Sequence, residues 1–290
     1  MSRARGAPVP SLSILIPSWN NLPYLRLCIE EIRATSAAAH QIVVHVNQGA
    51  DGTREWLEAE GIASTWTPEN AGVCTAMNMA RTLATGDLLL YMNDDMVPCP
   101  GWDTALLRAA AEHPDGRFYL SATMIEPRAT GNACVRAPHD FGHDARTFDR
   151  AALHAAAPGL IGPDWSGATW PPSLMTAAMW DRVGGYSEEF SPGLYSDPDL
   201  SRKLWEAGVR TFRGVGDSLV YHFMSKSLGR VTLNPGKRQF RRKWGMSSST
   251  FLAHYLRLGR PYAGPLPERP PASAGLMLAR AKDRLKGWSP

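Results

Sequence analysis

The sequence is poor in cysteine and has no long hydrophobic run. No Cys-x-x-Cys pair occurs among its four cysteines, Cys28, Cys74, Cys99 and Cys134. Neither a disulfide framework nor a zinc knuckle is therefore indicated, and we expect reduced thiols in or near the core. No apolar stretch approaches the length needed to cross a bilayer, and the N-terminal segment lacks the apolar region of a signal peptide. These absences predict a cytoplasmic protein.

A dinucleotide-binding glycine motif is also missing. No Gly-x-Gly-x-x-Gly follows the first predicted strand, and Gly214-Val215-Gly216 lies too late in the chain and lacks the third glycine. This argues against a nucleotide-dependent dehydrogenase. The chain has 44% hydrophobic and 20% charged residues, which excludes a disordered protein. Its 290 residues allow one large α/β domain or two small ones with a substantial core.

Charge is distributed unevenly along the chain. From His222 onward there are 14 Lys and Arg residues against 2 acidic ones, whereas 17 basic and 25 acidic residues precede it. The tail therefore carries +12 and the body −8. A basic tail predicts either an anionic partner, such as phosphate, a membrane surface or nucleic acid, or only a solvated segment.

Strand-like and helix-like segments alternate over the first hundred residues. Short apolar or β-branched runs predict strands, and residues with helical spacing separate them. The predicted strands are 12–17, 41–46, 63–66 and the run that begins at Leu88; the predicted helices include 22–35 and 73–84. This alternation predicts a doubly wound, mainly parallel α/β sheet, in which ligands bind at the carboxyl ends of the strands.

The stretch from Asp87 to Met96 is central, because an apolar run there ends in Asn93-Asp94-Asp95. A buried parallel strand would place these acids at the carboxyl edge of the sheet. Adjacent carboxylates repel each other, and a hard divalent cation with oxygen ligands is the usual solution. A solvated turn explains the same residues, because Asn-Asp-Asp before Val-Pro-Cys-Pro is good turn chemistry. Both interpretations remain open on this stretch alone.

Polar motifs follow the predicted strands in order along the chain. They are Ile16–Asn20, Asn47–Thr53, Asn70–Gly72 with Asn78, Gly86-Asp87, Asn93–Asp95, Gly184–Glu188, Ser196–Leu200 with Ala207-Gly208, and Tyr221-His222. Together these motifs resemble those of the family 2 glycosyltransferases of the GT-A fold, and the resemblance covers about residues 11–230. It implies an α/β domain of GT-A type that transfers a sugar from a nucleotide diphosphate donor with inversion at the anomeric carbon.

The resemblance further implies a divalent cation, Mn²⁺ or Mg²⁺, bound at the acidic motif. Asp95 is the expected ligand, His222 completes the site, and Asn93 or Asp94 contacts the ribose, the sugar or a water. Asn93 replaces the first acid of the family motif, so an oxygen is kept and a charge is lost. The cation is needed because diphosphate is a poor leaving group until its developing charge is neutralised. A structural role at a strand end is the alternative for His222.

Donor contacts are expected in the loops after the first strands and in a basic lid over residues 224–237. Asn47 stands where the family often carries Asp, and its carboxamide can pair with a pyrimidine edge. For Trp19, a core or rim aromatic remains the alternative. The predicted donor-binding residues are Pro17, Ser18, Trp19, Asn47, Asn70, Gly72, Asn78, Asn93, Asp94 and Lys226.

Asp197 is the expected catalytic base, again by resemblance. Ser196 replaces the acid that precedes it in the family, whereas Asp197 keeps the base position. Asp199 is assigned more readily to the first turn of the following helix. The segment from Asp164 to Trp170 has the aromatic content expected around a sugar ring, although structural tryptophans explain it equally well.

The expected organisation is a leader at 1–10, a GT-A domain at 11–236 and a basic helical extension at 237–290. Residues 11–100 would bind the nucleotide sugar and 101–236 the acceptor. In the extension, Pro261 to Pro271 reads as a linker. The helix from Ala274 to Trp288 then places apolar residues on one stripe: Leu278, Ala281, Leu285 and Trp288. This stripe could lie on an anionic membrane, whereas docking on the protein body or on a second subunit is the more ordinary interpretation.

The expected partners are a UDP-, GDP- or dTDP-linked sugar and a glycan or small-molecule acceptor, with no nucleic acid. A homodimer and peripheral contact with the inner face of a membrane are further expectations. The alternative to an enzyme is a non-catalytic nucleotide-sugar or glycan-binding protein with the same fold. Asn93 and Ser196 support that alternative, because each replaces an acid of the family motifs.

Overall fold

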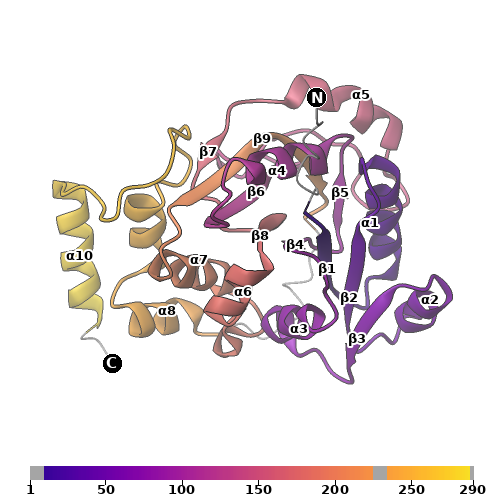
Figure 1. Cartoon of the computed structure of the whole chain (residues 1–290), viewed down its shortest axis with the longest axis horizontal. Coiled ribbons are helices and arrows are strands. Elements are labelled where there is room, and N and C mark those ends of the chain that lie inside the picture. The colour runs from indigo at the N-terminus through magenta and orange to yellow at the C-terminus, as the bar shows by residue number, and fades with distance from the viewer. Residues whose placement is uncertain (1–9, 225–233, 288–290) are drawn as a thin grey trace, which may run out of the picture.

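The computed structural model describes residues 10–224 and 234–287. One mixed β-sheet runs through the molecule in the strand order β3-β2-β1-β4-β8-β6-β9-β5, and β7 pairs with β9 beside this path. Figure 1 shows the sheet at the centre, with α1 and α2 at one end of the molecule and α10 at the other. No helix in the described residues is both long and apolar enough to span a membrane.

The N-terminal part of the sheet confirms the predicted alternation. β1 pairs in parallel with β2 and β4, and β2 pairs in parallel with β3. The elements here are β1 (Leu12–Trp19), α1 (Leu22–Thr35), β2 (Gln41–Asn47), α2 (Thr53–Ala59), β3 (Ala63–Thr67), α3 (Gly72–Arg81), β4 (Leu88–Tyr91), β5 (Met96–Pro98) and α4 (Trp102–Ala111).

The C-terminal part makes the sheet mixed rather than purely parallel. β8 lies between β4 and β6 and is antiparallel to both, whereas β6 and β9 are parallel. The elements are β6 (Phe118–Ile125), α5 (Arg150–Leu160), β7 (Trp165–Ser166), β8 (Ser173–Thr176), α6 (Ala177–Val183), η1 (Glu188–Phe190), α7 (Ser196–Glu206) and β9 (Thr211–His222). The segment between β6 and β7 contains α5.

Strand direction places six strand ends at one edge of the sheet. β8 is antiparallel to both β4 and β6, so β4 and β6 run in the same direction. The strands β1, β2, β3, β4, β6 and β9 therefore all run the same way. Their carboxyl ends therefore meet at a common edge, where α/β proteins bind ligands. Asn47 and His222 are the last residues of two of these strands.

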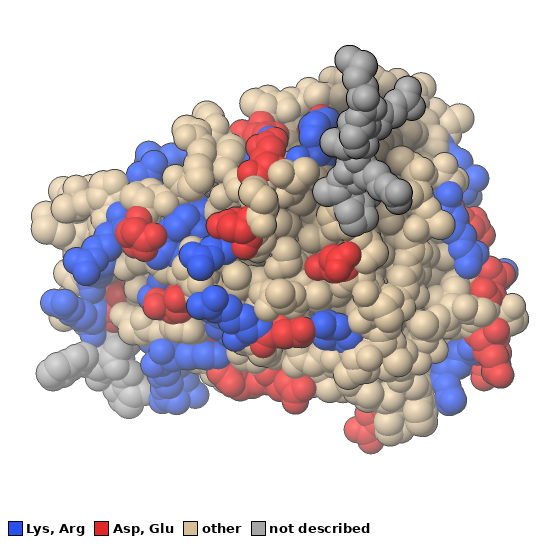
Figure 2. Space-filling view, viewed as in Figure 1, with Lys and Arg blue, Asp and Glu red and all other residues tan. Residues whose placement is uncertain are grey.

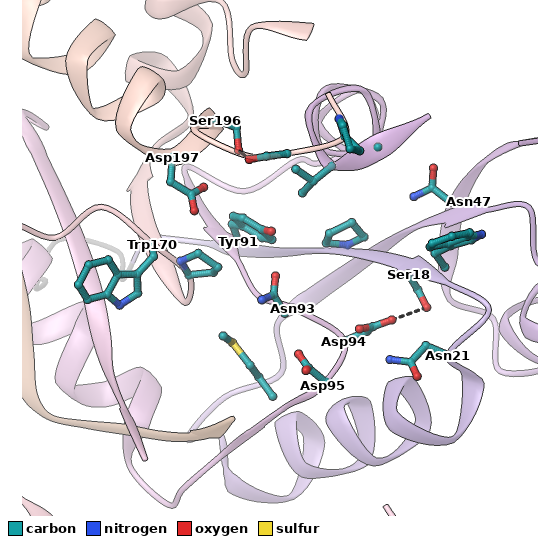
Figure 3. Close-up of a pocket in the computed structure, with 18 of the residues that line it drawn as sticks. Ser18, Asn21, Asn47, Tyr91, Asn93, Asp94, Asp95, Trp170, Ser196 and Asp197 are labelled. Atoms are coloured by element: carbon teal, nitrogen blue, oxygen red, sulfur yellow. Dashed lines mark hydrogen bonds between the residues drawn. The ribbon is translucent and has the colours of Figure 1, made fainter. Parts of the chain in front are cut away.

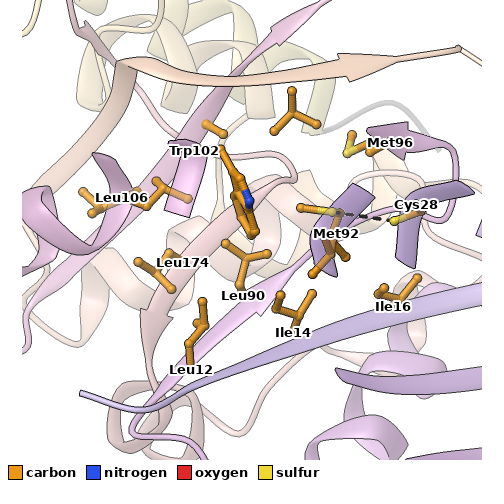
Figure 4. Packing of buried hydrophobic residues seen from close by; sticks show 14 of the residues in the cluster. Leu12, Ile14, Ile16, Cys28, Leu90, Met92, Met96, Trp102, Leu106 and Leu174 are labelled. Carbon is orange, nitrogen blue, oxygen red and sulfur yellow. Dashed lines mark hydrogen bonds between the residues drawn. The ribbon is translucent and has the colours of Figure 1, made fainter. Parts of the chain in front are cut away.

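Side chains alternate between the two faces of the sheet, as the two-residue period of a strand requires. In β1, Ile14 and Ile16 pack with α1 and α4, whereas Leu15 packs with α3. Figure 4 shows the first face, where the indole of Trp102 lies close to Leu90 among buried aliphatic side chains. Trp102 is fully buried, so α4 is fixed against the strands that lead to the candidate site.

The C-terminal extension packs on the second face through short helices. They are α8 (Gly236–Trp244), α9 (Ser248–Thr250), η3 (Phe251–Tyr255, a π-helix) and α10 (Ala274–Gly287). Segment 261–271, expected as a linker, lies against the body instead. Leu266 within it is buried, and its backbone N–H donates to the carbonyl of Arg210 at 2.8 Å.

Candidate active site

A pocket of ≈ 570 Å³ opens at the common carboxyl edge of the strands. This volume is within the usual range for small-ligand sites. Eleven predicted site residues line it: Pro17, Ser18, Trp19, Asn47, Asn70, Gly72, Asn93, Asp94, Asp95, Asp197 and His222. Figure 3 shows Asp197 on the opposite side of the pocket from Asp94 and Asp95, with Tyr91 and Asn93 between them in this view. The fold thus brings together residues from both halves of the chain.

The Asn93–Asp95 loop joins β4 to β5 and is held from several sides. Ser18 donates its hydroxyl to Asp94 Oδ2 at 2.7 Å, which ties the loop to the end of β1 (Figure 3). The backbone N–H of Phe223 donates to the carbonyl of Asp95 at 3.1 Å, and the side chain of Asp95 is buried. The acids are therefore part of a rigid, partly buried loop and not of a solvated turn.

Asp95, His222 and Glu126 form a chain of polar contacts beneath the pocket. His222 Nε2 lies 3.6 Å from Asp95 Oδ2, and His222 Nδ1 lies 3.1 Å from Glu126 Oε1. Burial lowers the pKa of His222, but the charge of Asp95 and the bond to Glu126 outweigh that effect and raise it overall. The side chain of Glu126 is also buried, so its carboxylate holds the ring with Nε2 toward Asp95.

This pair of side chains suits a divalent cation that shares its other ligands with a diphosphate and water. Mg²⁺ is usually bound in this way, through one or two protein ligands plus substrate phosphates. The 3.6 Å between Asp95 Oδ2 and His222 Nε2 leaves room for both to ligate one ion. In residues 10–224 and 234–287, no group of three or more His, Cys, Asp or Glu side chains forms a metal site from protein atoms alone. The two-ligand site therefore fits, and a cation there remains a prediction.

The end of the pocket near β2 presents carboxamide nitrogens. The Asn47 oxygen accepts the backbone N–H of Ala71 at 2.9 Å, and the Asn70 oxygen accepts that of Gly72 at 3.0 Å. These bonds fix which atom of each carboxamide is oxygen, because a backbone N–H only donates. Figure 3 shows the Asn47 nitrogen on the side that faces the pocket. The half-buried Trp19 completes this end, with its indole N–H bound to Gln48 at 3.1 Å.

A close approach of two loops closes one wall of this pocket. Gly72 has φ of +79°, and a Cβ built on it would lie 2.6 Å from the Cα of Pro192. The backbone N–H of Val73 donates to the carbonyl of Pro192 at 3.0 Å. Only glycine at position 72 therefore permits this close approach of the two loops. That requirement explains why residue 72 is a glycine better than a direct contact with the donor does.

Asp197 lies in the first turn of α7 with its carboxylate in the pocket. The Tyr186 hydroxyl donates to Asp197 Oδ1 at 3.0 Å. Desolvation raises the pKa of Asp197 to about 7, and the bond from Tyr186 lowers it in part. A carboxyl group with a pKa near neutrality is suited to accept a proton. Asp199 faces away from the pocket and accepts the indole N–H of Trp244 at 2.7 Å, as its structural assignment predicted.

One predicted donor-binding residue within the described part of the chain, Asn78, does not line the pocket. Asn78 lies on α3, where its carboxamide accepts the backbone N–H of Tyr186 and donates to its carbonyl, both at 2.9 Å. The expectation of a donor contact at Asn78 is wrong in this geometry, because both polar atoms hold the loop that carries Tyr186. Lys226 and most of the predicted lid lie outside the described residues.

The tryptophans predicted near the sugar have separate roles. Trp165 is buried in the core, and its indole N–H donates to Thr123 at 3.0 Å. Trp170 stacks on Trp165 with ring centroids 5.3 Å apart and lines the pocket. Trp165 therefore has a structural role, and a sugar contact at Trp170 stays a prediction.

Sequence reasoning missed Glu126 and Tyr186, the two side chains that hold His222 and Asp197. Glu126 directly follows β6, so the rule that polar residues after parallel strands gather at one edge could have found it. Tyr186 carries no comparable signal, because the turn at 184–187 reveals nothing about which carboxylate its hydroxyl meets. Loop 192–195, which also lines the pocket, was not predicted as part of it.

Comparison with known proteins identifies the fold and finds a family model that matches part of the chain. A solved structure of GalNAc-T7 with UDP, GalNAc and Mn²⁺ superposes with a TM-score of 0.61 at 12% identity, covering 85% of this chain and 51% of that one. The chain therefore has the GT-A fold. Residues 13–132 match the model of glycosyl transferase family 2. This match covers less than half of the 290 residues of the chain.

Two curated bacterial proteins are similar to this chain in sequence. The uncharacterized protein y4gI of Sinorhizobium fredii is 25% identical over 256 residues, and the O-antigen biosynthesis protein RfbC of Myxococcus xanthus is 22% identical over 238 residues. The matches cover 81% and 73% of this chain. The chain spans only 27% and 17% of the lengths of these relatives.

Proposed function

We propose that the protein is a metal-dependent, inverting glycosyltransferase that moves a sugar from a nucleoside diphosphate to an acceptor hydroxyl. The observation that carries this proposal is the placement of a single carboxylate, Asp197, across one pocket from the Asp95–His222 pair. The family and fold support glycosyl transfer, and the UDP, GalNAc and Mn²⁺ bound to GalNAc-T7 support a nucleotide donor and a cation. The name of RfbC supports a glycan acceptor.

The proposed reaction is a single displacement. The acceptor oxygen forms a bond to the anomeric carbon while the bond from that carbon to the diphosphate oxygen breaks. Asp197 takes the acceptor proton; Tyr186 binds Oδ1, which leaves Oδ2 for this transfer. A divalent cation held by Asp95 and His222 supplies charge neutralisation at the leaving diphosphate, so that no second acid is needed.

The donor would lie between the carboxamides and the acidic loop. Asn47 and Asn70 would donate to the base or ribose through their nitrogens, since backbone N–H groups already occupy their oxygens. Trp170, on the side of Asp197, would pack against a sugar ring. The choice among UDP, GDP and dTDP, a homodimer and a cytoplasmic location remain predictions from the sequence.

A non-catalytic nucleotide-sugar-binding protein is the second candidate. Two substitutions favour it, because Asn93 and Ser196 each replace an acid of the family motifs. Ser196 is buried, and its hydroxyl donates to the carbonyl of Gly193, so it closes the turn before α7 and takes no part in a charge network. In this candidate the same pocket binds the donor, and neither transfer nor hydrolysis follows.

Nucleotide sugars are expected to raise the melting temperature only when Mn²⁺ or Mg²⁺ is present. Binding to the folded state stabilises it by mass action, by about 2.7 kcal/mol at a ligand concentration a hundred times Kd. A panel of UDP-, GDP- and dTDP-sugars would be screened by thermal shift with Mn²⁺ or with EDTA. Donors that bind would then be assayed for hydrolysis and transfer. Binding without turnover on any acceptor would favour the non-catalytic candidate, and no binding would reject both.

Replacing Glu126 by Ala is expected to weaken Mn²⁺ binding by about 10–100-fold, as loss of an outer-shell partner of a metal-bound His commonly does. The variant frees His222 to rotate away from Asp95, whereas Glu126→Gln keeps an acceptor for Nδ1 and should recover part of the affinity. Calorimetric titration of Mn²⁺ in the presence of the bound nucleotide measures the effect. Glu58→Gln, an exposed acid on α2, is the matched control. Unchanged Mn²⁺ affinity in Glu126→Ala would show that Glu126 does not position His222.

A further inference from the structure

The rotation of α10 about its axis is fixed by contacts on one side. Leu276 and Asp283 are buried against the body. Asp283 Oδ2 accepts the backbone N–H of Ser247 at 2.9 Å and the Thr250 hydroxyl at 2.7 Å. At 100° per residue, positions 276 and 283 lie within 20° of each other, so these contacts define the inner side of the helix. Leu278, Ala281 and Leu285 of the predicted stripe therefore do not dock on the body, so that interpretation is wrong for them, and Trp288 lies outside the described residues.

The outer side of α10 is an apolar stripe formed by Met277, Leu278, Ala281 and Leu285. Met277, Leu278 and Leu285 are 65%, 58% and 76% exposed. They are three of the six large hydrophobic side chains that are exposed in the described part of the chain. Such side chains gathered on one helix mark an interaction surface, whereas single exposed ones do not.

Basic side chains border this stripe. Lys282 and Arg284 flank it on the helical wheel, and both are exposed. The neighbouring α8, which packs on α10, adds the exposed Lys237, Arg238 and Arg242. Figure 2 shows Lys and Arg gathered at the end of the molecule formed by α8 and α10.

Acidic charge does little to offset these cations. Between residues 234 and 287, the acids are Glu268 and Asp283. Glu268 pairs with Arg210 at 2.8 Å, and Asp283 is buried by the contacts described above. The apolar stripe therefore belongs to a segment, residues 234–287, of net positive charge.

We propose that the outer side of α10 binds the surface of an anionic lipid bilayer. The apolar side chains would enter the boundary between headgroups and acyl chains, while Lys282 and Arg284 reach the phosphates beside them. Each basic residue near an anionic surface contributes attraction that salt weakens. This proposal rests on α10 and α8 alone and holds whether or not the pocket transfers sugar.

Charge favours this occupant over the others. A second copy of the chain related by twofold symmetry would place the same basic borders against each other, and these like charges would repel. Nucleic acid would use the Lys and Arg residues but would leave Met277, Leu278 and Leu285 in water. An anionic bilayer satisfies both the apolar stripe and its basic borders.

The test uses the full chain and vesicles of phosphatidylcholine alone or of equal parts phosphatidylcholine and phosphatidylglycerol. Co-sedimentation should show binding only to the anionic vesicles, with loss at high salt. The double variant Leu278→Ser/Leu285→Ser should bind about tenfold or more weakly, because it removes two of the apolar anchors. Lys282→Glu/Arg284→Glu should abolish the preference for phosphatidylglycerol. Leu83→Ser/Ile161→Ser, two exposed apolar residues elsewhere, is the matched control and should bind normally.

Exposed positions are chosen so that all variants keep the wild-type melting curve. The proposal is overturned if the wild type fails to bind anionic vesicles, or if Leu278→Ser/Leu285→Ser binds them equally well. Light scattering tests the alternative, a second copy of the chain. If the wild type is a dimer that does not bind vesicles, and Leu278→Ser/Leu285→Ser is a monomer, the stripe is a subunit interface.

Discussion

Asp197→Asn is expected to lower the transfer rate by about 10²–10⁴-fold, the usual contribution of a general base, while donor affinity stays nearly unchanged. Asn has the same shape and still accepts the Tyr186 hydroxyl, so the pocket keeps its form. It cannot take the acceptor proton. Single-turnover rates and donor Kd measured on the same preparation separate these two effects. Normal turnover in this variant would show that the base is a different group.

The pH dependence of the wild type provides an independent check of the base. The pKa of Asp197 is raised to about 7, so the base is protonated and inactive below that pH and active above it. The rate should therefore rise as pH increases through about 7. Tyr186→Phe removes a bond that favours the carboxylate, so it should shift this rise to higher pH and keep the plateau.

The stability of the protein should respond in the opposite direction. Because the pKa of Asp197 is higher in the folded state than its usual 3.8, ionising it costs stability as pH rises from about 4 through 7. Asp197→Asn removes that cost. The variant should therefore melt at or above the wild-type temperature at pH 8, which rules out unfolding as the reason for lost activity.

Asp95→Asn is expected to abolish Mn²⁺-dependent donor binding, with a larger loss of Mn²⁺ affinity than the ~10–100-fold expected when an outer-shell partner is removed. The substitution removes the charge from the carboxylate that lies 3.6 Å from His222 Nε2. Calorimetry with the nucleotide, in Mn²⁺ and in EDTA, measures the loss. Asp94→Asn is the comparison, because Asp94 is bound to Ser18 and its loss should cost less metal affinity.

Asn93→Asp tests the same site by adding a negative charge instead of removing one. It restores the acid found in the family motif, and added ligand charge raises cation affinity. Tighter Mn²⁺ binding is expected. If Asp95→Asn kept full metal-dependent donor binding, the cation would lie elsewhere or play no part.

The N-terminal half of the fold could be predicted because its signals are local. Strands of four to eight residues with buried runs, such as Leu88–Tyr91, alternate with helices of 3.6-residue spacing. The exact bounds of α1 were predicted from this period alone. Antiparallel β8 was not, because its direction depends on how residues 126–172 return across the sheet, which no local pattern encodes.

The candidate site, like the fold, was predicted from the sequence only in part. Residues at or just after the carboxyl ends of the parallel strands, such as Asn47, Asp95 and His222, were identified in order along the chain and meet at one edge. Asn78 was misassigned because its motif position is next to the pocket wall, while its side chain turns toward the backbone of Tyr186. The direction of a side chain from a helix depends on what packs against that helix.

By itself, the sequence determined the α/β class, the family motifs, the acidic loop at Asn93–Asp95 and the basic, amphipathic character of the C-terminal helix. Each depends on neighbours within a few residues. Only the tertiary structure decided that Glu126 holds His222, that Tyr186 meets Asp197, and that the apolar stripe of α10 faces outward. These are contacts between distant segments, and they follow from strand direction and helix rotation, which are set when the whole core packs.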